Sequence, residues 1–216
     1  MKYRNGRRKL ELKERALPIY PEDVPTTLQT RAIHIAPITN ELGLEVVEKL
    51  RTLTSTLSLD PQGFLREFDE QGSVHPKKWD AENLLDKVDI YKSSFDEIKV
   101  ATGTSDLPSA IRRVHDYGVK IIIVTRGARG ATLSFEGEIQ DIPPCRTSIN
   151  RDPTGAGDVF IGAFLAEYVK GKDLEWCACV GCAASSFVAE GIGPAVFGEK
   201  EKTYLRARQI YGKELK

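Results

Sequence analysis

Residues 152–164 (DPTGAGDVFIGAF) hold the strongest candidate for chemistry in this sequence. The small residues Gly155, Ala156 and Gly157 let a ligand approach the backbone closely, and they stand where a helix is expected to begin. The unpaired amides and the positive dipole end of a helix start favour an anion such as phosphate. Asp158, in the first turn, would be stabilised as a carboxylate that can accept a proton from an attacking hydroxyl. The pattern indicates phosphoryl transfer, with a plain capped helix start as the alternative.

Strands and helices alternate around this segment. Strands are expected at residues 32–36, 56–60, 88–91, 119–125, 131–135 and 138–142, and helices at 40–54, 80–87, 95–103, 106–117, 156–170, 174–190 and 199–211. Asn40 and Ser94 are the candidate N-caps of two of these helices. Residues 119–125 (VKIIIVT) are typical of a parallel strand covered on both faces, and a hairpin follows. We expect an α/β domain with a mainly parallel sheet and a ligand site beyond the carboxyl ends of its strands.

The composition is that of an ordinary globular protein. The 216 residues are 41% hydrophobic and 29% charged, which excludes disorder for the bulk of the chain. Lys plus Arg (31) equals Asp plus Glu (31), so we expect neither nucleic acid nor a membrane as partner; a nucleic-acid binder acting through the basic residues 2–13 is a remote alternative. No apolar run approaches the roughly 18 residues of a membrane span, and no signal-peptide core is present, so we expect a cytoplasmic protein.

Three of the four cysteines, Cys177, Cys179 and Cys182, follow a C-x-C-x-x-C spacing that could suggest a metal site. On a helix, however, the first and last of them point about 140° apart, so three thiolates would not converge on one ion. Four cysteines are also few for a disulfide framework. We therefore interpret them as reduced thiols that pack within a helix.

Residues 152–164 resemble the C-terminal signature of the ribokinase-like (PfkB) carbohydrate kinases at every required position. The resemblance implies that Asp158 is the catalytic base and that the amides of Gly155, Ala156 and Gly157 hold the transferring phosphoryl group. It also implies a three-layer Rossmann-like fold, in which a mainly parallel sheet is flanked by helices, and an ATP-dependent kinase.

The resemblance extends to two segments on the nucleotide side. Residues 125–130 (TRGARG) resemble the family's nucleotide-binding hairpin, which implies that Thr125, Gly127 and Gly130 lie near ATP. Residues 181–184 (GCAA) are similar to the family's adenine-side helix, where Cys182 either faces the base or packs in the core; the two alternatives are equally open.

Metal-binding residues are implied in the same way. Ser94-Phe95-Asp96-Glu97 stands where the family has an N-x-x-E motif, whose glutamate positions Mg²⁺, usually through water. Glu97 is retained, but serine replaces the asparagine, and the segment is also a plain capping box. Asp152 and Thr154, with the loop near Gly191 and Gly193, match positions that hold a monovalent cation such as K⁺ in some members.

Several short segments are most similar to the myo-inositol kinase branch of the family. They are residues 34–38 (HIAPI), 60–70 (DPQGFLREFDE), 92–94 (KSS) and 192–194 (IGP). The resemblance therefore implies myo-inositol as the first acceptor to consider, with another sugar or a nucleoside as the alternative, because other sugar kinases share the Asp-Pro strand end.

The sequence departs from the family at its start. Family members have an additional N-terminal portion with the first strands and most acceptor contacts, and nothing here corresponds to it. We expect residues 1–25, with a surface strand at 7–15, to form a residual lid-type strand and connector, and residues 26–216 to form the nucleotide-binding and catalytic domain. Three interpretations remain: a truncated or mis-started chain, a split protein completed by another chain, or a non-catalytic ATP-binding subunit. Uncovered sheet edges would favour association, for example as a homodimer.

Overall fold

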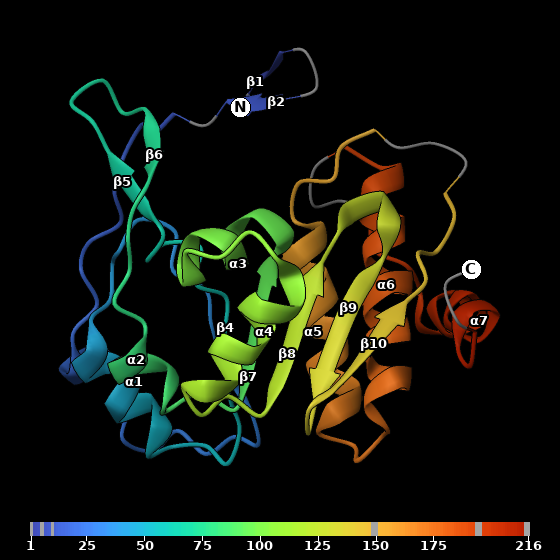
Figure 1. Ribbon diagram of the computed structural model, residues 1–216. Helices are drawn as coiled ribbons and strands as arrows, with labels where there is room; N and C mark the ends of the chain where they lie inside the picture. Colours follow the sequence, from blue (N-terminus) through green and yellow to red (C-terminus); the bar gives the residue numbers. More distant parts are fainter. Residues whose placement is uncertain (1, 5–6, 10, 148–150, 193–195, 214–216) are drawn as a thin grey trace. The chain divides into compact units, whose positions relative to one another are not determined.

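The computed structural model describes residues 2–4, 7–9, 11–147, 151–192 and 196–213 (Figure 1). The chain divides into two compact units, Met1–Tyr91 with Asp96–Val119 and Lys92–Phe95 with Lys120–Lys216. This division does not coincide with the boundary expected after residue 25, and that boundary stays a prediction. Among the described residues, no helix is both long enough and apolar enough to span a bilayer.

The first unit contains a parallel sheet with helices around it. Its elements in chain order are β1 (Lys2–Arg4), β2 (Arg7–Lys9), the 3-10 helix η1 (Pro21–Asp23), β3 (Ile33–Ile35), α1 (Leu44–Arg51), β4 (Leu57–Leu59), β5 (Arg66–Phe68), β6 (Val74–Pro76), α2 (Glu82–Leu85), β7 (Ile90–Ser94), α3 (Phe95–Thr102) and α4 (Leu107–Asp116). β7 begins in this unit and ends in the second one, and α3 begins with Phe95 of the second unit and continues in the first. β3 and β4 pair in parallel, as do β4 and β7, whereas β5 and β6 form an antiparallel hairpin. The apolar residues of β4 are completely buried, as expected for a parallel strand.

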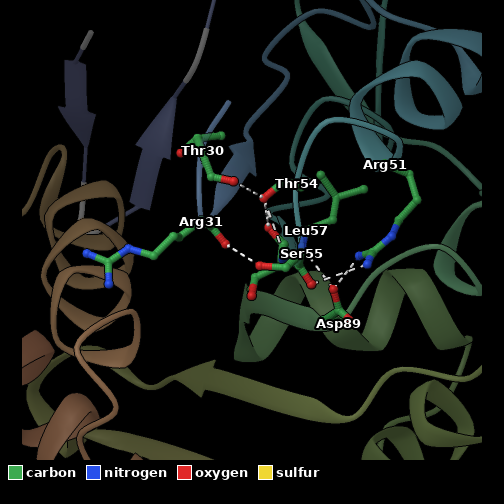
Figure 2. Close-up of polar contacts among 8 residues, drawn as sticks. Thr30, Arg31, Arg51, Thr54, Ser55, Leu57 and Asp89 are labelled. Atoms are coloured by element: carbon green, nitrogen blue, oxygen red, sulfur yellow. Dashed lines mark hydrogen bonds and ion pairs between the residues drawn. The ribbon is translucent and has the colours of Figure 1, made fainter. Parts of the chain in front are cut away.

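Side-chain hydrogen bonds hold the amino ends of these parallel strands (Figure 2). The carboxylate of Asp89, just before β7, accepts hydrogen bonds from the backbone N–H of Leu57 at 2.9 Å and from the guanidinium of Arg51. The hydroxyl of Thr54 donates to the carbonyl of Thr30 at 3.2 Å. Side chains thus satisfy backbone groups at the strand starts, where the ladder hydrogen bonds have not yet begun.

The second unit combines an antiparallel hairpin with three helices. Its elements are β8 (Ile121–Thr125), the 3-10 helix η2 (Gly127–Arg129), β9 (Ala131–Phe135), β10 (Glu138–Ile142), α5 (Ala156–Tyr168), α6 (Leu174–Glu190) and α7 (Lys200–Ile210). β9 pairs antiparallel with both β8 and β10, and α6 packs against β9 and β10 (Figure 1). α5 and α6 approach closely because Gly181 has no side chain; a Cβ there would lie 3.0 Å from the carbonyl oxygen of Phe160.

A buried carboxylate joins the three helices of this unit. Glu167 of α5 is 3% exposed and accepts hydrogen bonds from Lys170 at 2.6 Å, from the indole of Trp176 at 3.1 Å and from the hydroxyl of Tyr204 at 2.7 Å. Trp176 and Tyr204 belong to α6 and α7, so this one side chain links the last helix to the other two. A carboxylate with three donors is a stable way to bury a charge.

Most expected elements are confirmed, with ends shifted by a few residues, but two expectations were wrong. Within the predicted strand at 7–15, Arg7–Lys9 is a strand, and the described residues after it, 11–15, do not continue it. The helix predicted from Asn40 begins at Leu44, because Asn40 has a left-handed φ of 61° and its side chain donates to the carbonyl of Arg66 instead of capping a helix. The carboxylate of Glu41 accepts from the amides just before it and so stabilises this turn.

Apolar side chains are exposed along the connector that precedes β3. Leu17 is 85% exposed and Tyr20 is 50% exposed. Such exposure is compatible with the expected association of chains, which stays a prediction.

Candidate functional site

The predicted phosphate-binding segment forms the start of α5, here called the α5 turn (residues 155–158). Gly155 is the N-cap residue with a left-handed φ of 83°, and a Cβ at this position would meet nothing within 4 Å. The N–H of Ala156 donates to the carbonyl of Pro153 at 3.1 Å. This amide therefore has an acceptor within the chain, contrary to the expectation that it is open to a ligand. Among the described residues, no acceptor is present for the amides of Gly157 and Asp158. These two first-turn amides remain for an external acceptor.

The side chain of Asp158 is exposed. It lies in the first turn of α5, where the helix dipole stabilises a carboxylate. An exposed carboxylate beside uncommitted amides can meet both a phosphoryl group and a hydroxyl, whereas a buried carboxylate could meet neither. The α5 turn therefore combines a helix start that favours an anion with an accessible carboxylate.

The loop before the α5 turn is held by its own side chains. The Oδ1 atom of Asp152 accepts from the backbone N–H of Thr154 at 3.0 Å and from its hydroxyl at 2.5 Å. Both residues are half-buried, and their oxygens are the type that binds a monovalent cation. Gly191 caps the end of α6, and Gly193 lies outside the described residues. The expectation of a cation site stays a prediction.

The predicted nucleotide-binding hairpin has the expected turn. Thr125 ends β8, and its hydroxyl donates to the carbonyl of Ser93 at 3.3 Å. A Cβ at Gly130 would lie 2.1 Å from the carbonyl oxygen of Ile142, so chain packing alone requires a glycine there. A Cβ at Gly127 would meet nothing within 4 Å, which leaves this glycine open to a ligand.

The cysteines of α6 lie in the core. Cys182 is 7% exposed, and burial raises the pKa of its thiol well above the ordinary value. Burial also raises the pKa of Cys177 and of Cys179 to about 12. These thiols are therefore protonated at neutral pH, and the burial of Cys182 is compatible with the packing alternative. Within the described part of the chain, no group of three or more His, Cys, Asp or Glu residues is placed to hold a metal ion.

The first unit contains Glu97, the acid that the resemblance places at Mg²⁺. Glu97 lies in the first turn of α3, and its Oε1 atom accepts from the side-chain amide of Gln62 at 3.4 Å. The backbone N–H of Gln62 in turn donates to Oδ1 of Asp60, a buried residue directly after β4. Ser94 is the last residue of β7, directly before α3. The strand end thus orients Gln62, and Gln62 orients Glu97.

One charged residue near the α5 turn was not among the predicted site residues. Lys92 of β7 is 4% exposed, and its Nζ atom lies 2.7 Å from the position that a Cβ on Gly157 would occupy. In the sequence, Lys92 was part of the segment 92–94 (KSS) that resembles the myo-inositol kinase branch. The available signal was a lysine within a strand of otherwise uncharged residues, β7 (IYKSS).

The fold is that of an α/β protein, and the α5 turn is the kind of helix start that favours an anion. The profile described as pfkB family carbohydrate kinase matches residues 39–200, and the chain belongs to this family.

Similar proteins include kinases for different acceptors. The chain is 30% identical over 156 residues to a cytidine kinase of Thermococcus kodakarensis, covering 71% of this chain and 53% of that protein. It is 28% identical over 187 residues to an inositol 3-kinase of Zea mays, covering 85% of this chain and 46% of that protein. A solved structure of a pyrophosphate-dependent myo-inositol-1 kinase converted by mutation into a myo-inositol-3 kinase matches with a TM-score of 0.80 and 27% identity, covering 94% of this chain and 71% of that one.

These matches confirm the α/β ribokinase fold, with mostly parallel strands and flanking helices. The chain spans about half the length of the curated relatives it matches.

Proposed function

We propose that the protein is an ATP-dependent phosphotransferase that moves the γ-phosphate to a hydroxyl of a small polyol. Membership of the pfkB carbohydrate kinase family supports this class of reaction. The observation that carries the proposal is the α5 turn, where two uncommitted amides and an exposed carboxylate occupy adjacent positions.

The α5 turn acts on the transferring phosphoryl group. Gly155 allows a left-handed backbone that admits the group without a side chain in its way, and the amides of Gly157 and Asp158 donate hydrogen bonds to its oxygens. The carboxylate of Asp158 accepts the proton of the attacking hydroxyl. Since the transition state of phosphoryl transfer is loose, alignment and charge neutralisation account for most of the rate, and the base acts late.

Residues suited to ATP and Mg²⁺ are present. The carboxylate of Glu97 is half-buried and oriented by Gln62, and carboxylate oxygens are the ligands that Mg²⁺ prefers; Glu97 would hold the ion, directly or through water. The ion would neutralise charge on the phosphates. Thr125 and Gly127 would lie along the nucleotide, where the missing Cβ of Gly127 leaves room. Asp152 and Thr154 remain the proposed ligands of K⁺.

The first acceptor to consider is myo-inositol. The chain resembles an inositol 3-kinase over most of its length, and a myo-inositol kinase structure matches with a TM-score of 0.80. A nucleoside is the second candidate, because the cytidine kinase relative is 30% identical over 71% of this chain. A non-catalytic ATP-binding protein remains the third alternative.

A kinase assay that measures ADP release separates these candidates. The wild-type chain is tested with myo-inositol, cytidine, ribose and fructose in the presence of Mg²⁺ and ATP. Asp158→Asn is expected to lower turnover by roughly 10²–10⁴-fold while ATP still binds. Near-normal turnover of this variant would remove the assignment of the base. ATP binding without transfer to any acceptor would favour the non-catalytic alternative.

A further inference from the structure

We propose that Arg206 of α7 is a positioning residue, which holds the C-terminal end of α6 and through it the loop that leads into the α5 turn. This role rests on the proposed function, because it concerns how the chain fixes the place of the α5 turn. All the residues involved belong to the second unit. The connection has three consecutive links, from α7 to α6, from α6 to Arg151, and from Arg151 to the α5 turn.

The first link is made by the guanidinium group of Arg206. It donates to the hydroxyl of Ser186 at 2.7 Å and to the carboxylate of Glu190 at 3.0 Å, and it lies over the ring of Phe187, 3.6 Å from the ring centroid. The hydroxyl of Ser186 is itself oriented, because it donates to the carbonyl of Ala183 at 2.7 Å. One planar side chain thus contacts three residues in the last two turns of α6.

This arrangement differs from an exposed ion pair. The side chains of Arg206 and Glu190 are only 26% and 25% exposed. An exposed pair adds little to stability, because both side chains must give up their freedom in water to form it. The guanidinium group here is fixed along its edge by two hydrogen bonds and on its face by an aromatic ring. It therefore fixes the end of α6 against α7.

The second link joins the end of α6 to the segment before the α5 turn. The backbone N–H of Arg151 donates to the carbonyl of Ala189 at 2.8 Å. Ala189 is one of the last four residues of α6, whose carbonyls have no N–H partner within the helix. It stands between Phe187 and Glu190, the two residues held by the guanidinium group. A displacement of this turn would therefore displace the acceptor of the Arg151 amide.

The third link runs from Arg151 into the α5 turn. Oδ1 of Asp152 accepts from the backbone N–H of Thr154 at 3.0 Å. The carbonyl of Pro153 accepts from the N–H of Ala156 at 3.1 Å. These local hydrogen bonds leave the short segment little freedom. The position of the α5 turn therefore depends on the end of α6, and through it on the guanidinium group of α7.

Phosphoryl transfer is sensitive to such positioning, because a displacement of about 1 Å can cost about 100-fold in rate. The residues proposed to lie along ATP, Thr125 and Gly127, belong to the hairpin of β8 and β9 and not to this connection. Loss of the Arg206 guanidinium should therefore lower kcat more than it raises KM for ATP.

The test compares two substitutions in α7. Arg206→Met keeps an extended side chain and removes the guanidinium group. Tyr204→Phe is the matched control, since it removes the hydroxyl that donates to Glu167 of α5 and leaves the end of α6 unchanged. Steady-state ADP release is measured at a temperature where all the proteins are folded. Hydrogen exchange, followed by mass spectrometry, is measured in the peptide that contains Arg151 and Thr154.

Arg206→Met is expected to lower kcat about tenfold, with KM for ATP changed by about threefold at most. It should also make hydrogen exchange in the Arg151 peptide about tenfold faster, because the acceptor of that amide is no longer held in place. Tyr204→Phe should lower the melting temperature but leave kcat and exchange in this peptide unchanged.

Each other outcome is decisive. Unchanged kcat or unchanged exchange in Arg206→Met, or equal losses in both variants, would overturn the role of Arg206. If Arg206→Met does not fold, as judged by thermal denaturation, Arg206→Gln keeps a polar end and is held to the same two criteria. A wild-type chain that transfers phosphate to none of the acceptors named above would overturn the proposed function, whereas the exchange measurement would still decide whether Arg206 holds the loop.

Discussion

Gly157→Ala is a sensitive probe of the α5 turn, because it adds one methyl group at a position where the structure identifies the neighbour. The new Cβ would lie 2.7 Å from Nζ of Lys92, whereas ordinary contacts begin at 3.4 Å. The ammonium group must therefore withdraw by about 0.7 Å. Among the described residues, apart from the chain neighbours and the backbone of α5 itself, the other atom within 4 Å is Cε of the same flexible side chain, at 3.6 Å.

The two consequences of this substitution differ in size. Stability should change by about 1 kcal/mol or less, because the gain of helix propensity offsets the displacement of a flexible side-chain end. Nucleotide binding should suffer more, because the methyl group would stand beside the Gly157 amide that donates to a phosphate oxygen in the proposed function. We expect the ATP analogue AMP-PNP to bind about tenfold more weakly, as for the loss of one hydrogen bond to a charged group, with ADP little affected.

A double-mutant cycle with Lys92→Ala tests which neighbour of the methyl group matters. Lys92→Ala removes the ammonium group but leaves the Gly157 amide in place, so Gly157→Ala should weaken AMP-PNP binding by a similar factor in both backgrounds. Calorimetry on the four proteins gives the affinities, and thermal denaturation gives their stabilities. A loss that disappears in the Lys92→Ala background would refute the reasoning, since it would mean that the methyl group acts through the displaced ammonium group and not on the Gly157 amide.

Two further predictions concern the residues that support each unit. Burial raises the pKa of Glu167, but hydrogen bonds from Lys170, Tyr204 and Trp176 outweigh this effect and lower the pKa below 4.5. The ionised carboxylate therefore stabilises the folded state at pH values above the pKa that Glu167 has in the unfolded chain. This stabilisation is lost as the pH falls through the pKa of Glu167 in the folded state. Glu167→Gln should therefore cost about 1–3 kcal/mol at neutral pH and less near pH 4, measured by urea denaturation, and a pH-independent difference would contradict this. Gln62→Met should raise the Mg²⁺ concentration needed for nucleotide binding by about threefold to tenfold in a calorimetric Mg²⁺ titration, and an unchanged Mg²⁺ requirement would show that Gln62 does not orient a metal ligand.

The elements of the fold were predictable where local pattern and burial agree. Residues 119–125 are nearly all apolar and β-branched, and Ile121–Thr125 is a largely buried strand that leads into the expected hairpin. The helix start near residue 40 was not predictable, because the choice there depends on a tertiary contact. Asn40 can cap a helix or occupy a left-handed turn, and its hydrogen bond to the carbonyl of Arg66, distant in sequence, stabilises the turn.

Only part of the site was predictable, because the sequence shows local motifs but not tertiary contacts. The small residues and the acid of the α5 turn are adjacent in sequence, so their chemistry is visible as a motif. Lys92 lies far from them in sequence, and a lysine in a strand is ordinarily exposed. Its position beside Gly157 is a tertiary contact. Lys92–Phe95 pack in the second unit, whereas the chain before them, Met1–Tyr91, packs in the first.

The glycines of the motifs show why spacing alone cannot assign function. Gly130 and Gly155 both stand in segments that resemble kinase motifs, but their surroundings differ. A Cβ at Gly130 would collide with the carbonyl of Ile142, so that glycine is explained by the packing of its own hairpin. A Cβ at Gly155 would enter open space, and there the left-handed backbone and the space beside it are available to a ligand. A Cβ at Gly157 would meet the end of the Lys92 side chain, which is flexible enough to move, so packing does not require this third glycine.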